Sequence, residues 1–171
     1  MSRPDALPPN AVFCTARADS DASAKRESVE TLRTLIGISR QGELFFHLLA
    51  QTGMPQPLVL VVTRLIDVKA ALARELSAQV IDSGEIFPGI PISPAEQHAS
   101  SRYLQLLRAI DGAVTSSQID DIDDIEDQFL WRLENVVGRL NSSPVRASLL
   151  SYAPQLQACR RDLQRIARTT R

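Results

Sequence analysis

The chain has 171 residues, of which 44% are hydrophobic and 23% charged, so it fits one ordinary globular domain and excludes collagen-like, wholly disordered and membrane-embedded proteins. Its 19 basic and 20 acidic residues nearly cancel, which leaves no net field to attract nucleic acid or an anionic membrane. Cys14 and Cys159 form neither a disulfide framework nor a zinc motif, and we therefore expect a cytoplasmic protein.

The N-terminal segment predicts an irregular arm over residues 1–24. It contains Pro4, Pro8 and Pro9, shows no sustained apolar period, and lacks the apolar run of a secretory signal. From residue 25 onward apolar side chains recur every three or four positions, which is the period of a helix packed on one side. Residues 25–171 are therefore predicted to form a single helical domain.

Proline, glycine and N-cap signals divide this domain into successive helices. Gly53 is expected to end the first helix in the left-handed conformation. Ser93 supplies an N-cap hydroxyl, with a proline directly after it and Glu96 at the capping-box position. Ser117 and Asp120 have the same spacing. The helices are predicted at about residues 25–52, 55–83, 94–111, 117–141 and 144–169.

Two charge runs near the C-terminus have one structural explanation. The acidic run 118–127 lacks the glycine and terminal glutamate of a calcium loop, and the C-terminal arginines lack the aromatic residues of a nucleic-acid stripe. If the last two helices form an antiparallel hairpin, Asp120 lies level with Arg165 and Asp124 with Arg161. Exposed pairs contribute less than about 1 kcal/mol each, so they set the register of the hairpin.

Two carboxylates occupy positions where the helical period requires apolar side chains. Glu126 lies between Ile122 and Phe129 on one seam, and Glu43 falls on the seam that begins at Val29. Both are expected to face inward. A buried carboxylate without a partner is costly, so such acids meet a cation, a metal ion or each other.

Three short stretches carry a further indication: Arg-Gln-Gly-Glu-Leu-Phe-Phe at 40–46, Leu-Ala-Arg-Glu-Leu at 72–76 and Asp-Ile-Glu-Asp-Gln-Phe-Leu at 124–130. With the succession of helices, they resemble the ferritin-like bundles of unknown function in bacterial stress-associated proteins. The resemblance spans about residues 27–166. It implies an all-α, ferritin-like antiparallel four-helix bundle with an extra crossover helix in the segment 84–112.

The resemblance also implies where a di-iron site would lie. Glu43 and Glu126 match the two lone glutamate ligands, whereas the two Glu-x-x-His positions are occupied by Asp-Val-Lys-Ala at 67–70 and Gln-Ala-Cys-Arg at 157–160. Neither stretch has an imidazole. His47, one turn beyond Glu43, is either a substitute ligand or a residue at the boundary of the core.

A metal-free bundle follows if an internal cation replaces the metal. By the hairpin register Arg160 lies near Glu126, and its planar guanidinium is predicted to bridge Glu126 and Glu43. Gly42 either allows close packing beside Glu43 or marks a break in the first helix.

We therefore expect the protein to act as a protein-interaction or stress-associated module. It is expected to have neither catalytic residues nor a cofactor. The alternative is a degenerate iron- or manganese-binding oxidase with Glu43, His47, Asp67 and Glu126 as ligands. The apolar residues Ile86, Phe87, Ile90 and Ile92 either form an interaction surface for a second copy or another protein, or cap their own core. Neither nucleic acid nor a membrane is expected as a partner.

Overall fold

The computed structural model describes residues 11–82, 92–140 and 143–170, with the side chains of 11–28 and of 143 left out. All regular structure in these residues is helical, which confirms the all-α class. The helices are α1 (Ala11–Leu49), α2 (Gln56–Asp82), α3 (Pro94–Ala109), α4 (Ser116–Arg139), α5 (Ser143–Leu150) and α6 (Tyr152–Thr169).

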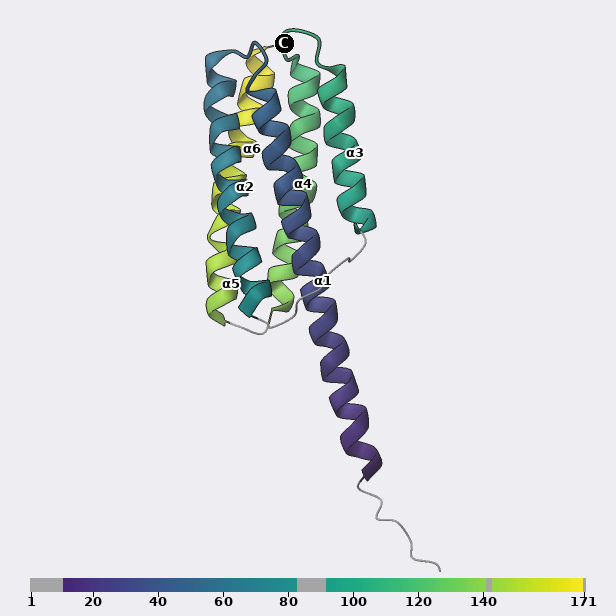
Figure 1. Cartoon of the computed structure of the whole chain (residues 1–171). Helices are drawn as coiled ribbons and strands as arrows, with labels where there is room; N and C mark the ends of the chain where they lie inside the picture. The colour runs from purple at the N-terminus through teal and green to yellow at the C-terminus, as the bar shows by residue number, and fades with distance from the viewer. Residues whose placement is uncertain (1–10, 83–91, 141–142, 171) are drawn as a thin grey trace, which may run out of the picture.

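A ring of helices forms the bundle. α1 packs against α2 and α4, and α6 closes the ring by packing against the same two helices, while α3 lies outside it against α1 (Figure 1). The N-terminal half of α1 extends well beyond the end of the bundle (Figure 1). None of the described helices combines the length and the hydropathy needed to cross a lipid bilayer.

α3 carries the chain back along the bundle. Gly37 lies against Glu96, and Phe45 stacks on Tyr103 further along both helices, so α1 and α3 run in parallel. In contrast, Tyr103 bonds Glu126 whereas Ala109 bonds Gln118, so α3 and α4 are antiparallel. Consequently α2 and α4 run in the same direction, and α3 is the crossover between them.

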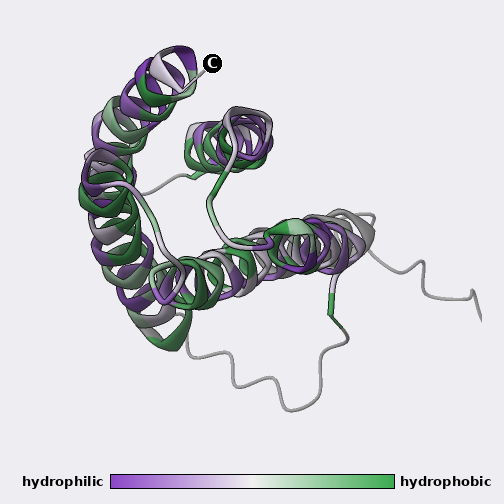
Figure 2. Ribbon diagram, turned by 90° about the horizontal axis from the view of Figure 1, so that it is seen from above, coloured by the Kyte–Doolittle hydropathy of each residue, from purple (hydrophilic) through white to green (hydrophobic). Residues whose placement is uncertain are grey.

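The core follows the apolar seams of the helices, each of which carries one apolar and one polar side (Figure 2). The apolar seam of α2 is entirely buried, as is the isoleucine face of the acidic run in α4. These buried residues are Leu58, Val61, Leu65, Val68, Leu72 and Leu76 in α2, and Ile119, Ile122 and Ile125 in α4.

The helix ends differ from several predictions. α1 begins at Ala11, in a stretch rich in alanine and free of proline, so residues 11–24 are helical where an irregular arm was expected; residues 1–10 lie outside the description. α1 ends at Leu49, and the glycine with a left-handed backbone in the described residues is Gly112, with φ of 84°, and not Gly53.

The N-caps are partly as predicted. The Ser93 hydroxyl accepts the backbone N–H of Glu96 at 3.2 Å, as expected for the start of α3. α4, however, is capped by Thr115 and Gln118, which form both bonds of a capping box, and not by Ser117 and Asp120.

The last predicted helix is divided at Ser151 into α5 and α6. Pro154 explains the break, because it has no N–H to donate to Leu150 and its ring clashes with that carbonyl. The amphipathic seam nevertheless continues through the break, with Leu149 and Leu156 fully buried on either side.

Gly42 lies within continuous helix, buried where α1 meets α2 and α3. A Cβ atom at this position would lie 2.9 Å from the Tyr103 hydroxyl and 3.2 Å from Lys69 Cε. Both distances are shorter than ordinary van der Waals contact. Gly42 is therefore a close-packing position and not a helix break.

The change Gly42→Ala is expected to destabilise the protein by about 1–3 kcal/mol, because Tyr103 and Lys69 must move. Gly138→Ala is the matched control: a Cβ there meets nothing within 4 Å, and alanine should add up to about 1 kcal/mol of helix stability. Urea unfolding of both variants at one protein concentration checks this pair. Equal effects would contradict the packing role of Gly42.

Candidate functional site

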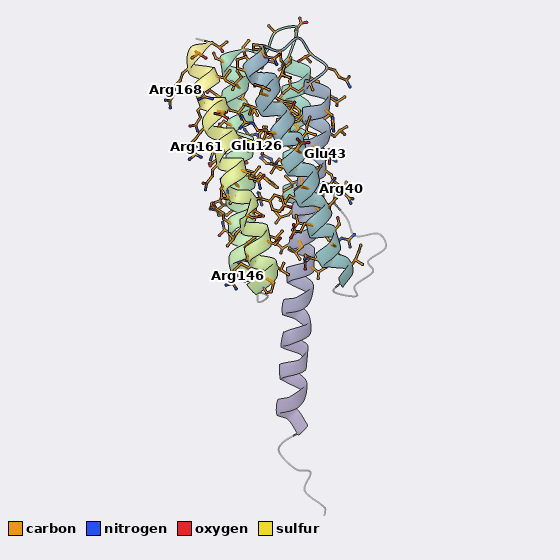
Figure 3. All side chains as sticks on the ribbon, turned by 90° about the vertical axis from the view of Figure 1, so that its left-hand side faces the viewer. Arg40, Glu43, Glu126, Arg146, Arg161 and Arg168 are labelled. Carbon is orange, nitrogen blue, oxygen red and sulfur yellow. The ribbon has the colours of Figure 1, made fainter. Side chains whose placement is uncertain are left out.

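A buried ion pair lies at the centre of the bundle. Lys69 Nζ, from α2, is 2.8 Å from Glu126 Oε2, from α4, and both side chains are completely buried. The two groups form an ion pair at this separation, and neither Lys69 Nζ nor Glu126 Oε2 has a hydrogen-bond partner among the described residues. Figure 3 shows Glu126 between the helices, whereas Arg161 and Arg168 lie on the outer side of α6.

Two aromatic rings complete the surroundings of this pair. The Tyr103 hydroxyl, from α3, donates a hydrogen bond of 2.8 Å to Glu126 Oε1. Lys69 Nζ lies 3.4 Å from the centroid of the Phe129 ring, which attracts the ammonium through its negative face. The two oxygens of Glu126 therefore meet a donor and a cation, and the ammonium meets a carboxylate and a ring.

Four helices build this site. The seam of α4 directs Glu126 and Phe129 inward, one turn apart. Lys69 follows Val68 on the buried side of α2, and α3 brings Tyr103 over α1. Gly42 of α1 leaves the space that Lys69 and Tyr103 fill. The site depends on α3 as well as on the ring of the bundle.

Burial shifts the proton affinities of the groups at this site. It lowers the pKa of Lys69 from the ordinary 10.5, and the charge of Glu126 opposes that shift. Burial, and then the Glu126 carboxylate, raise the pKa of Tyr103 well above 10.0. Tyr103 therefore remains a hydrogen-bond donor at neutral and moderately alkaline pH.

The four predicted metal ligands do not come together. Glu126 is buried as expected, but the side chain of Glu43 is 31% exposed and lies 3.9 Å from His47, which is 56% exposed. Asp67 is exposed on α2. Within the described residues, no group of three or more His, Cys, Asp or Glu side chains has the spacing of a metal site.

The predicted bridge from Arg160 to Glu126 and Glu43 differs from the structure. Arg160 Nε contacts Asp123 Oδ1 at 2.8 Å, and its Nη1 contacts Asp127. The antiparallel register of α4 and α6 is as predicted, but Arg160 faces the edge between the two helices and not the centre. Lys69 takes the place that was assigned to Arg160.

Lys69 and Tyr103 were missed by the sequence analysis. One signal was available for Lys69, which lies four residues after Leu65 and three before Leu72, on the apolar side of α2. Nothing in the sequence relates Tyr103 to Glu126, because their contact depends on how α3 returns across the bundle.

The predicted apolar surface falls mostly outside the described residues, which do not include Ile86, Phe87 and Ile90. Ile92 is described and is 67% exposed. Cys159 is buried in α6, and burial raises the pKa of its thiol, as expected of an inert packed cysteine.

Comparisons with known proteins add no assignment. No protein-family model matches the chain, and no match was found among curated proteins or solved structures.

Lys69→Met is expected to destabilise the protein by about 3–5 kcal/mol, because it leaves the Glu126 carboxylate buried and unpaired. Adding Glu126→Gln should recover much of this loss, since the amide carbonyl still accepts the Tyr103 hydroxyl without carrying charge. Urea unfolding of the single and double variants measures the coupling.

Arg64→Met is the matched control for Lys69→Met. It removes a positive charge from the same helix, but Arg64 is 50% exposed and its pair with Asp162 is on the surface, so the cost should stay below about 1 kcal/mol. Equal costs for the two changes, or no recovery in the double variant, would show that the buried pair is not coupled.

The raised pKa of Tyr103 predicts a loss of stability at alkaline pH. Because the folded value lies above the unfolded one, the contribution of Tyr103 is fully present below pH 10 and is lost as pH rises beyond it, by up to about 1.4 kcal/mol per pH unit. Tyr103→Phe should remove this slope, and urea unfolding at several pH values measures it. The pKa of Lys69 is shifted in the opposite direction. Because the wild type and Tyr103→Phe both contain Lys69, its contribution to the pH dependence cancels when the two are compared.

Absorbance of ionised tyrosine provides an independent reading, because the chain has two tyrosines. Tyr152 is partly exposed and donates a hydrogen bond to Glu75, so it should titrate in the folded protein, with a pKa above 10.0. Tyr103 should ionise only as the protein unfolds. Two tyrosines that titrate together before unfolding would contradict the buried hydrogen bond.

Proposed function

We propose that this chain is a metal-free, ferritin-like helical bundle that acts as a protein-interaction or stress-associated module and catalyses no reaction. The observation that carries the proposal is the contact of the Lys69 ammonium with Glu126 at the centre of the bundle. In a di-iron bundle, metal ions balance the carboxylates at this level. Here a lysine of the same chain supplies the positive charge.

The arrangement of the helices supports the ferritin-like part of the proposal. α1 and α6 run one way and α2 and α4 the other, with α3 as a crossover outside the ring. A long crossover between the second and third helices of the bundle is typical of ferritin-like folds. The sequence resemblance and the topology thus favour the same fold.

The chemistry of the central site favours a structural role. Both oxygens of Glu126 have partners in Lys69 and Tyr103, and a nearby ammonium repels a divalent cation. A metal ion at this position would have to displace Lys69 into an apolar core. Glu43 and His47 lie at the rim of the bundle, where solvent competes with any ligand contact.

A bundle with an inert centre acts through its surface. Trp131 is 62% exposed in the middle of α4, and a large exposed aromatic side chain is typical of protein contact sites. This exposure supports an interaction module over an enzyme.

Metal content after anaerobic loading with Fe(II) or Mn(II) and removal of free metal tests the proposal. The wild-type protein is expected to retain no stoichiometric metal by mass spectrometry. Glu43→Ala tests the predicted ligand, and Glu30→Ala, on an exposed position of the same helix, is its control. About one or two metal ions per chain that are lost in Glu43→Ala, and retained in Glu30→Ala, would overturn the proposal and favour the oxidase alternative.

A further inference from the structure

One exposed stripe runs the length of α4 on the side away from the core. Its members are separated by alternate steps of three and four residues, and all of them are exposed. They are Asp121, Asp124, Gln128, Trp131, Asn135 and Gly138. Trp131, the single tryptophan of the chain, is the first member of the C-terminal half of this stripe.

Two hollows flank Trp131. The hollow on the α6 side has a volume of about 390 Å³ and is lined in part by Glu134 and Gln157. The hollow on the α1 side has a volume of about 270 Å³ and an apolar floor of Leu35 and Val136. A projecting ring between two hollows forms a ridge and two grooves, against which a helix of complementary shape can pack.

The edges of the stripe carry opposite charges. Asp127, Glu134 and Arg160 line the hollow on the α6 edge, and because Arg160 contacts Asp127, Glu134 leaves this edge with a net negative charge. Arg132 and Arg139 line the hollow on the α1 edge. The acidic edge and the basic edge therefore lie on opposite sides of Trp131.

This charge pattern selects both the partner and its orientation. A two-fold axis parallel to α4 brings the acidic edge of one copy against the basic edge of the other. A two-fold axis perpendicular to α4 would place acid against acid and base against base. Along the helix, Glu134 lies between Arg132 and Arg139, within about 8 Å of both at 1.5 Å rise per residue. A parallel pair therefore brings each Glu134 near the arginines of the other copy.

We propose that a second copy of this chain docks on the C-terminal half of the α4 stripe, with the two α4 helices parallel and Trp131 at the centre. This inference rests on the proposed role as an interaction module and names its partner. Asp121 and Asp124 would repel their counterparts in such a pair, so the two helices must diverge towards their N-terminal ends. Contact is then confined to residues 128–139.

The association state of the full chain tests the proposal. Sedimentation of the wild type over a range of concentrations should show a dimer, and the emission of Trp131 should shift to the blue as the dimer forms. Trp131→Ala should weaken association at least about tenfold, as expected for a central aromatic residue. Leu60→Ala is the control, because Leu60 is 57% exposed on α2, away from the stripe, and its change should leave association unaltered.

Charge reversal tests the pairing of the edges. Glu134→Arg makes the α6 edge more basic, and Arg132→Glu with Arg139→Glu makes the α1 edge acidic, so each protein alone should associate at least about tenfold more weakly. An equimolar mixture of the two should form a heterodimer, because each basic edge then meets an acidic one. All of these residues are at least partly exposed, and circular dichroism checks that the variants fold.

Cross-linking tests the orientation. In a parallel pair Gln128 lies opposite its own counterpart, so Gln128→Cys in a Cys14→Ser background should form a disulfide dimer under mild oxidation. In an antiparallel pair it would instead cross-link to a chain that carries Asn135→Cys. That result would overturn the parallel arrangement.

A wild-type protein that stays monomeric up to about 200 µM, with constant Trp131 emission, would overturn the interface. So would a dimer that Trp131→Ala and charge reversal leave unchanged. Neither result bears on metal content, so the interface and the proposed metal-free bundle fail by different measurements.

Discussion

The structure depends on the neutralisation of two charges that the bundle has removed from water. Desolvation of one ammonium and one carboxylate costs several kcal/mol for each ion, and their attraction offsets this only when further contacts complete the site. Here the Phe129 ring faces the ammonium of Lys69, and the Tyr103 hydroxyl bonds Glu126. The need to provide partners for both charges involves all the helices that meet at the site. It explains why α1 has a glycine where α2 and α3 approach, and why the crossover α3 is part of the core.

The sequence predicted the features that depend on helical period and missed those that depend on packing between helices. The seams of α2 and α6 and the inward position of Glu126 were predictable, because an amphipathic helix shows its buried side through spacing alone. Residue counting along the hairpin of α4 and α6 gave the level of Arg160 correctly. It could not give the direction of Arg160 around its helix, and the arginine contacts Asp123 at the edge. Because lysine is usually a surface residue, the burial of Lys69 between Leu65 and Leu72 was not predicted.

Glu43 lies at the rim of the bundle, and not in the interior as predicted, because of α3. The seam predicted from Val29 assumes that α1 is covered on one side along its whole length. From Gly37 onward, however, α3 packs on α1, and the Glu96 side chain lies directly over Gly37. The buried side of α1 therefore turns towards α3, so that Gly42 and Phe45 become interior and Glu43 remains at the rim. A helix that packs against a further helix over part of its length does not have one buried seam throughout. The change in its buried side is visible only in the tertiary structure.

An internal cation has a further consequence for how such a bundle is used. A metal ion can enter, leave and change its oxidation state, whereas Lys69 is covalently part of α2 and has no exposed surface. The centre can therefore contribute stability and a defined arrangement of helices, but it offers no vacant coordination position for a substrate. Under the proposed function, the protein acts through outward residues held in place by that centre. α4 is the helix on which both requirements meet, because Glu126 and Phe129 fix its inner side while Trp131, two residues further on, faces solvent. The buried charges hold α4 in place and with it the backbone of Trp131, and a tryptophan side chain, which has two rotatable bonds, loses little conformational entropy when it is covered by a partner.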